Sequence, residues 1–80
     1  MLSVKVLGSG CANCAKLERT TTEAINQLGM DAQVEKVTDY ADIMRYNILV
    51  TPALVVNEQV VSAGRLPSTA EITTWLADAA

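Results

Sequence analysis

Two cysteines, Cys11 and Cys14, are the residues of this chain best suited to chemistry, and they stand between a strand-like run and a helix-like run. A thiol at the first turn of a helix meets unpaired backbone N–H groups and the positive end of the helix dipole. Both favour the thiolate, which is the reactive form of cysteine. A second thiol three residues further on lies about one helical turn away, close enough to close a disulfide. The pair is therefore suited to dithiol–disulfide exchange, with Cys11 as the attacking thiol and Cys14 as the resolving thiol.

Two alternatives to redox chemistry stay open for the cysteine pair. Free cysteine is often simply a small buried residue. A metal site is the second alternative, although zinc sites usually take four cysteine or histidine ligands and this chain has two cysteines and no histidine. Two thiolates alone can still hold a soft ion such as copper(I), or a trivalent arsenical. The chain would then be a soft-metal carrier or sensor; under the redox hypothesis it needs no metal and no cofactor.

Length and composition predict a single domain spanning residues 1–80. Half of the residues are hydrophobic, enough for a compact core without disulfide staples. The net charge is −3 and the Lys and Arg residues are scattered, so the basic stripe of a nucleic-acid binder is missing. No apolar run approaches the ~18 residues of a membrane span, and residues 1–10 lack the pattern of a secretory signal. We therefore expect a cytoplasmic monomer without nucleic-acid or membrane partners.

The elements around the cysteines are a strand over residues 2–7, bounded by Gly8, and a helix over residues 12–28, ended by Gly29. Steps of three and four residues mark the buried face of this helix. That face carries Cys14, Leu17, Thr21, Ala24, Ile25 and Leu28. Cys14 lies on this face and Cys11 does not, so the sequence predicts an inner and an outer cysteine.

A second strand is expected over residues 30–37, with Met30, Ala32 and Val34 facing inward. Because a helix connects the first two strands, they should be parallel. A short helix then begins after Thr38 or Asp39 and runs to about Tyr46. Its expected inward residues are Tyr40, Ile43 and Met44.

The last part of the chain predicts a hairpin and a helix. Strands over residues 53–56 and 59–63 are separated only by Asn57 and Glu58, which makes them antiparallel. Ser68 and Glu71 match a capping box that opens the final helix. The inward residues of that helix are Ile72, Trp75, Leu76 and Ala79. The order β-α-β-α-β-β-α predicts an α/β fold with a four-stranded mixed sheet and helices on both faces.

Pro52 stands directly before the third strand, where a proline cannot donate to a sheet. A cis Thr51–Pro52 bond would leave the thiols accessible and present the backbone of Thr51 to an extended substrate. An ordinary trans proline at the start of a strand is the alternative. The sequence alone favours trans, since most bonds before proline are trans.

Taken together, the strand, the Gly-x-Gly-Cys-x-x-Cys sequence, Thr51-Pro52 before a hairpin and Gly64 after it resemble the thioredoxin superfamily, in particular its small glutaredoxin-sized members. The resemblance covers nearly the whole chain. It implies a thioredoxin-like fold with a cis Pro52, and an enzyme, a thiol–disulfide oxidoreductase that carries electrons between protein disulfides and a disulfide reductase. It also implies Cys11 as nucleophile and Cys14 as resolving thiol. The implied substrate groove is lined by Gly10, Ala12, Val50, Thr51 and Gly64.

Three departures from the thioredoxin pattern concern the groups that set the reduction potential of the pair. Gly10 stands where thioredoxins carry tryptophan, Ala12-Asn13 stands between the cysteines where they carry Gly-Pro, and Lys5 stands where they carry a buried acid. A lysine that points at the cysteines would stabilise a thiolate. Alternatively, Lys5 extends away from them to solvent.

Overall fold

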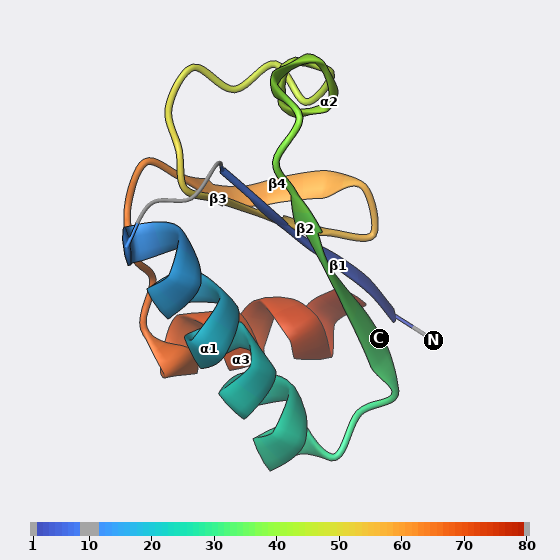
Figure 1. Cartoon of the computed structure of the whole chain (residues 1–80). Coiled ribbons are helices and arrows are strands. Elements are labelled where there is room, and N and C mark those ends of the chain that lie inside the picture. Colours follow the sequence, from blue (N-terminus) through green and yellow to red (C-terminus); the bar gives the residue numbers. More distant parts are fainter. Residues whose placement is uncertain (1, 9–11, 80) are drawn as a thin grey trace.

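The computed structural model describes residues 2–8 and 12–79 (Figure 1). Within these residues, strands and helices follow one another in the order expected from the sequence. The elements are β1 (Leu2–Leu7), α1 (Ala12–Leu28), β2 (Ala32–Val37), α2 (Tyr40–Met44), β3 (Ala53–Val56), β4 (Gln59–Ala63) and α3 (Thr69–Ala79).

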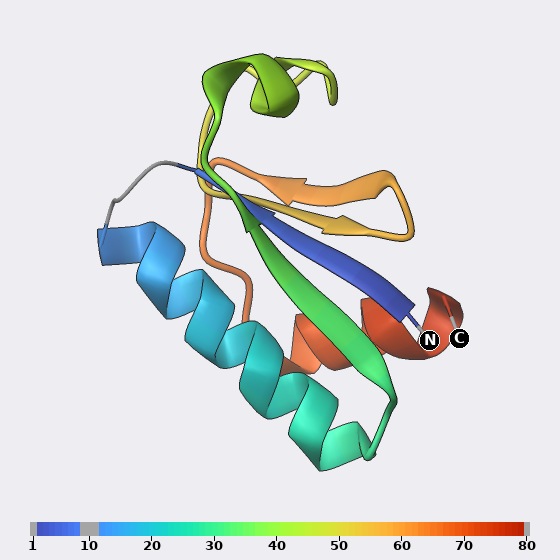
Figure 2. The ribbon, with the colours of Figure 1, turned by 45° about the vertical axis from the view of Figure 1, so that its right-hand side comes forward.

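The strands form one mixed sheet in the order β2-β1-β3-β4. β1 is parallel to β2, whereas β3 is antiparallel to both of its neighbours. Figures 1 and 2 show α1 and α3 on one face of this sheet and α2 on the other. The predicted element order, mixed sheet and helices on both faces are therefore confirmed.

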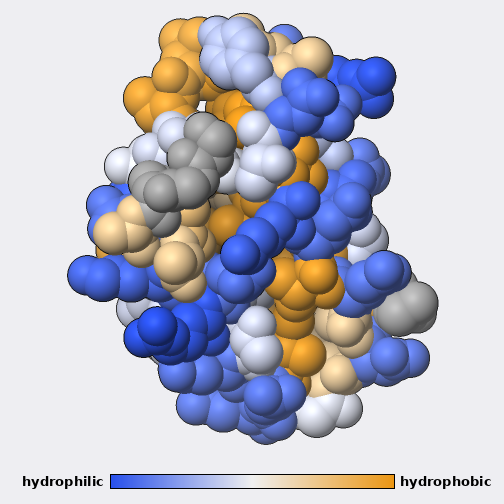
Figure 3. All heavy atoms as spheres, in the orientation of Figure 1, coloured by the Kyte–Doolittle hydropathy of each residue, from blue (hydrophilic) through white to orange (hydrophobic). Residues whose placement is uncertain are grey.

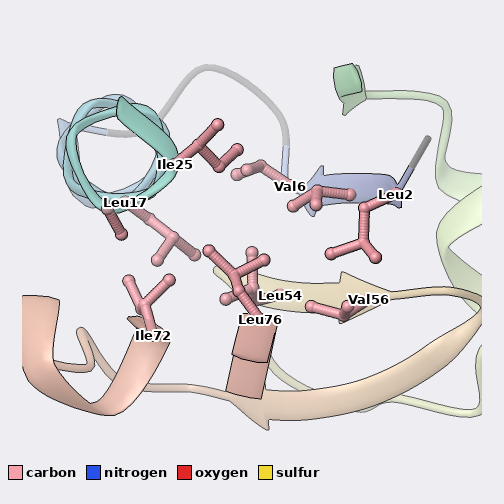
Figure 4. Packing of buried hydrophobic residues seen from close by; sticks show 10 residues of the cluster. Leu2, Val6, Leu17, Ile25, Leu54, Val56, Ile72 and Leu76 are labelled. Carbon is pink, nitrogen blue, oxygen red and sulfur yellow. The ribbon is translucent and has the colours of Figure 1, made fainter. Parts of the chain in front are cut away.

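The larger core lies between the sheet and the pair α1 and α3 (Figure 4). Val4 and Val6 point into it from β1, because alternate residues of a strand face the same side. Its fully or nearly buried members are Leu2, Val4, Val6, Leu17, Ala24, Ile25, Leu54, Val56, Ile72 and Leu76. Burying a side chain of this size stabilises the fold by ~1.5–3 kcal/mol. This core fixes β1 against α1, the helix that carries Cys14.

The second core lies on the other face, under α2. It contains Leu7, Ile43, Ile48, Ala53 and Val55. The predicted inward positions of Tyr40 and Met44 are wrong, since these side chains are 74% and 39% exposed. A helix of five residues offers the sheet little more than one inward position, which Ile43 takes. Ile48, after the helix, fills the rest of the space.

Two element boundaries and the burial of one residue also differ from the sequence prediction. α2 ends at Met44, before the predicted end near Tyr46, and β2 begins at Ala32, after the predicted start at residue 30. β2 is an edge strand, so its inward residues are only half-buried. Leu28, the last residue of α1, is 41% exposed although it continues the buried face.

Turn and capping residues explain why several elements begin or end where the sequence predicts. Asn57 and Glu58 both have positive φ, 49° and 68°, as a two-residue type I′ hairpin requires. At α3, the hydroxyl of Ser68 accepts from the backbone N–H of Glu71 at 3.2 Å, and the Glu71 carboxylate accepts from the backbone N–H of Ser68 at 3.1 Å. This is the predicted capping box. At the C-terminal end of α1, Gly29 has φ 65° and ends the helix as predicted.

Candidate functional site

The candidate site lies at one end of the sheet, where four segments converge. β1 ends there, α1 and β3 begin there, and β4 runs into the segment that leads to α3 (Figures 1 and 2). Of the predicted site residues, Gly10 and Cys11 lie outside the described residues. The other predicted site residues, Ala12, Cys14, Val50, Thr51, Pro52 and Gly64, are all described.

Cys14 is the third residue of α1 and is 8% exposed, whereas Ala12, the first residue, is exposed. The inner position predicted for Cys14 therefore agrees with the structure. Its sulfur lies against the backbone of Gly8. A Cβ placed on Gly8 would fall on Sγ of Cys14, and the same point lies 3.6 Å from Cβ of Thr51. Cys14 and Thr51 are thus neighbours across Gly8.

Gly8 is a site residue that the sequence pattern marked only as the end of a strand. Its φ is 150°, which disfavours residues with a side chain. The absence of a Cβ is what allows the Cys14 sulfur to approach the chain after β1. A glycine three residues before the first cysteine, directly after a buried strand, is the signal that could have identified it.

The Thr51–Pro52 peptide bond is cis, as the resemblance implied. Pro52 is buried and Thr51 is exposed. The carbonyl oxygen of Pro52 accepts from the backbone N–H of Gly64 at 2.9 Å, which joins the start of β3 to the end of β4. Thr51 is therefore held at the surface next to two anchored segments.

Val50 and Gly64 are in direct contact. Gly64 has φ 78°, and a Cβ placed there would lie 2.6 Å from Cγ2 of Val50. Val50 is 54% exposed and Leu49, before it, is 92% exposed. Figure 3 shows hydrophobic surface at the upper left of the molecule, over the segment that follows α2. The structure thus brings Cys14, Thr51, Val50, Pro52 and Gly64 into one neighbourhood.

The side chain of Lys5 extends away from Cys14, and its ammonium group is bound by other side chains of the protein. It lies on the face of β1 that α2 covers, together with Leu7, whereas α1 packs on the opposite face. Its Nζ donates to Glu58 at 2.7 Å and to Tyr46 at 3.1 Å. The hydrogen bond to Glu58, and then that to Tyr46, raise the pKa of Lys5 above its ordinary value. These partners lie 53 and 41 residues away, so no local sequence pattern announces them.

Arg65, next to Gly64, is paired within the chain. Its guanidinium donates to both carboxylate oxygens of Glu71, at 3.2 and 2.7 Å. The hydrogen bonds from Arg65 and from the backbone of Ser68 lower the pKa of Glu71 to about 2. The charge of Arg65 near the site is therefore largely compensated.

A metal site of the usual kind needs a cluster of ligating side chains, and a membrane span needs a long apolar helix. Over residues 2–8 and 12–79, no group of three or more His, Cys, Asp or Glu side chains is arranged to hold a metal ion. A soft-metal site made by two thiolates has fewer ligands than such a group. None of the helices in the described part of the chain is long and apolar enough to cross a membrane.

The thioredoxin domain family matches residues 2–77 of the chain. The chain is also similar over 72 residues to two proteins named thioredoxin. That of Methanothermobacter thermautotrophicus is 36% identical, and the match covers 90% of this chain and 94% of the relative. That of Methanocaldococcus jannaschii is 33% identical, with 90% of this chain and 83% of the relative covered.

Among solved structures, the germline-specific thioredoxin protein Deadhead from Drosophila melanogaster superposes with a TM-score of 0.69. The match covers 99% of this chain and 81% of that protein, at 18% sequence identity. At this identity the likeness bears on the fold alone. It confirms the thioredoxin-like architecture expected from the sequence.

Proposed function

Because the chain belongs to the thioredoxin domain family, we propose that it is a thiol–disulfide oxidoreductase that exchanges a Cys11/Cys14 dithiol with disulfides of other proteins. The observation that carries this proposal is the position of Cys14. It is buried in the first turn of α1, with its sulfur against Gly8 and beside the exposed Thr51. A resolving thiol needs such a protected place, close to the nucleophile and out of reach of substrate.

The reaction proceeds in two exchange steps. The thiolate of Cys11 attacks one sulfur of the substrate disulfide, the substrate S–S bond breaks, and the departing substrate thiolate takes up a proton. The thiol of Cys14 then gives up its proton, and the resulting thiolate attacks the Cys11 sulfur of this mixed disulfide. The intermolecular bond breaks, the second substrate sulfur leaves as a thiolate that takes up a proton, and a Cys11–Cys14 disulfide remains. Two electrons have passed from the protein to the substrate, and a disulfide reductase must supply them again.

The residues around the pair provide the substrate surface in this proposal. Thr51 is exposed and offers its backbone to an extended segment, which can pair with it as an added strand. Val50 and Gly64 form the neighbouring wall. Gly10 and Ala12 flank Cys11 in the sequence and leave room for the substrate because their side chains are small or absent.

Alkylation rates test the assignment of roles. In the reduced protein near neutral pH, we expect iodoacetamide to modify Cys11 much faster than Cys14, because Cys14 is buried and Cys11 precedes a helix. Peptide mass spectrometry after short exposure gives both rates. Equal rates, or faster modification of Cys14, would overturn the assignment.

Redox titration tests the activity. The protein should cycle between dithiol and disulfide in a dithiothreitol or glutathione buffer. A potential near ~−270 mV would indicate a thioredoxin-like reductant, and one near ~−120 mV an oxidant. A protein that does not cycle but binds copper(I) through both thiols would contradict the proposal in favour of the soft-metal carrier. We also propose a cytoplasmic location, because the disulfides that form in the cytosol are mostly transient and redox-cycling, whereas structural disulfides are rare there.

A further inference from the structure

Three side chains from separate parts of the chain meet on the sheet face that α2 covers. The ammonium of Lys5 donates to the hydroxyl oxygen of Tyr46 at 3.1 Å and to Oε1 of Glu58 at 2.7 Å. The hydroxyl of Tyr46 donates in turn to Oε2 of Glu58 at 3.0 Å. These contacts close a triangle, which we call the Lys5–Tyr46–Glu58 network. It joins β1, the turn that follows α2 and the β3–β4 turn.

The network is charged and partly shielded from solvent. The side chain of Lys5 is 22% exposed and that of Glu58 is 63% exposed. The hydrogen bonds with Lys5 and then Tyr46 lower the pKa of Glu58, while its partner Lys5 has a raised pKa. Both groups therefore stay ionised around neutral pH. Hydrogen bonds in which one partner is ionised are shorter and stronger than neutral ones, so Lys5 and Glu58 hold the Tyr46 hydroxyl in a defined place.

Tyr46 stands directly before the segment of residues 47–51, which ends at Thr51 and contains neither helix nor strand. Its first residue closes a turn, since the backbone N–H of Asn47 donates to the carbonyl oxygen of Met44 at 3.1 Å, and the rest of the segment takes its position from its anchors. Downstream, the anchor is the hydrogen bond between Pro52 and Gly64. Upstream, Tyr46 packs against the second core, and Ile48, the second residue of the segment, is buried in that core. The Lys5–Tyr46–Glu58 network fixes the polar end of this upstream anchor.

We propose that the Lys5–Tyr46–Glu58 network positions segment 47–51 so that Thr51 stands beside Cys14 in the geometry needed to receive a protein disulfide. The inference rests on the proposed function and deepens it. The three residues are positioning residues, because they act through the segment and not on the reacting sulfurs. A substrate that pairs with Thr51 depends on them, whereas a small disulfide that needs no backbone pairing does not.

The test compares two substrates on the same variants. Tyr46→Phe keeps the ring in the core and removes the hydroxyl, and Lys5→Met removes the charge at similar length. We expect each variant to react roughly 5- to 50-fold more slowly with a disulfide-bonded peptide that has several residues on each side of its cysteines. The rate with hydroxyethyl disulfide should stay within about twofold of the wild type, because that reaction bypasses the positioned backbone.

Matched controls separate the network from general effects. Tyr40→Phe removes the hydroxyl of an exposed tyrosine on α2, and Lys36→Met removes a lysine from the adjacent strand β2, where it pairs with Glu18 at 3.6 Å. Both controls should leave both rates unchanged. If Lys5→Met does not fold, Glu58→Gln takes its place, since Glu58 lies on an exposed turn and the amide preserves its shape.

The outcomes are distinguishable. Slower peptide exchange with unchanged reaction of hydroxyethyl disulfide supports the positioning role. Equal losses with both substrates, or no loss with the peptide, overturn it while the proposed function stands. A wild-type protein that reacts with neither substrate overturns the proposed function itself, and the positioning role with it.

Discussion

Replacing Gly64 with alanine probes the contact that closes the candidate site beside Val50. Gly64 has φ 78°, a left-handed conformation that costs a residue with a side chain ~1–2 kcal/mol. The new Cβ would also lie 2.6 Å from Cγ2 and 3.3 Å from Cβ of Val50, below ordinary van der Waals contact. Val50 is half exposed, so it can turn away at a cost of ~0.5–1.5 kcal/mol for an unfavourable rotamer.

The backbone and steric costs together set the expected loss in the free energy of unfolding. The smaller conformational freedom of alanine in the unfolded chain offsets ~0.4–1 kcal/mol of it. Gly64→Ala should therefore lower the free energy of unfolding by about 1–2.5 kcal/mol. Urea unfolding at neutral pH, followed by circular dichroism, measures this difference directly.

Val50→Ala provides the matched control, because it removes the Cγ2 atom that the new Cβ meets. Alone, this exposed substitution should change the free energy of unfolding by less than about 0.5 kcal/mol. Combined with Gly64→Ala, it should recover the ~0.5–1.5 kcal/mol of steric cost and leave only the backbone cost. Strictly additive effects would refute the contact, and an unaffected Gly64→Ala protein would refute the left-handed backbone as well.

Three further predictions concern Gly8, Glu71 and the core. Gly8→Ala should destabilise the fold by about 3 kcal/mol or more in urea unfolding, because its Cβ falls on the Cys14 sulfur; the Cys14→Ala background should relieve part of that loss. The folded-state pKa of Glu71 is lowered from 4.5 to about 2, so its stabilising contribution is complete above pH 4.5 and is lost as the pH falls towards 2. The difference in unfolding free energy between the wild type and Glu71→Gln should thus shrink over this range, and a constant difference would contradict the assignment. Leu76→Ala should cost ~2–5 kcal/mol, whereas Leu49→Ala, at a position 92% exposed, should cost less than about 0.5 kcal/mol; thermal unfolding compares the two.

The parts of the fold that the sequence predicted correctly are those with a complete local signal. The hairpin turn at Asn57 and Glu58 and the capping box at Ser68 and Glu71 each depend on residues within three positions of one another. The buried face of α1 repeats over several turns, so its period is unambiguous. In such places the local pattern and the tertiary packing agree, and the pattern suffices.

α2 shows where this agreement ends. Its five residues are too few to display a period, so Tyr40 and Met44 were expected to face inward and are exposed instead. The buried residue that completes this side of the core is Ile48, which lies beyond the helix. Only the packing of the whole second core decides which of these apolar residues is buried.

Some features of the candidate site could likewise be predicted from the sequence, and others depend on the packing of distant segments. The types and spacing of Cys11, Cys14 and Pro52 predicted chemistry at the start of α1, and the inner place of Cys14 followed from the helical period. The closeness of Gly8 to the Cys14 sulfur could not be predicted, because it depends on how β1 meets α1 in space. Nor could the partners of Lys5, since its contacts lie far away in the sequence.

The central claim, that Cys11 attacks and Cys14 resolves, is tested most directly by trapping the mixed disulfide. Reduced Cys14→Ser and Cys11→Ser proteins are mixed with a disulfide-bonded peptide and analysed by intact-mass spectrometry. The account predicts a stable adduct of Cys14→Ser that carries the peptide on Cys11, and no such adduct of Cys11→Ser. An adduct that forms equally on both variants, or only on Cys11→Ser, would contradict it.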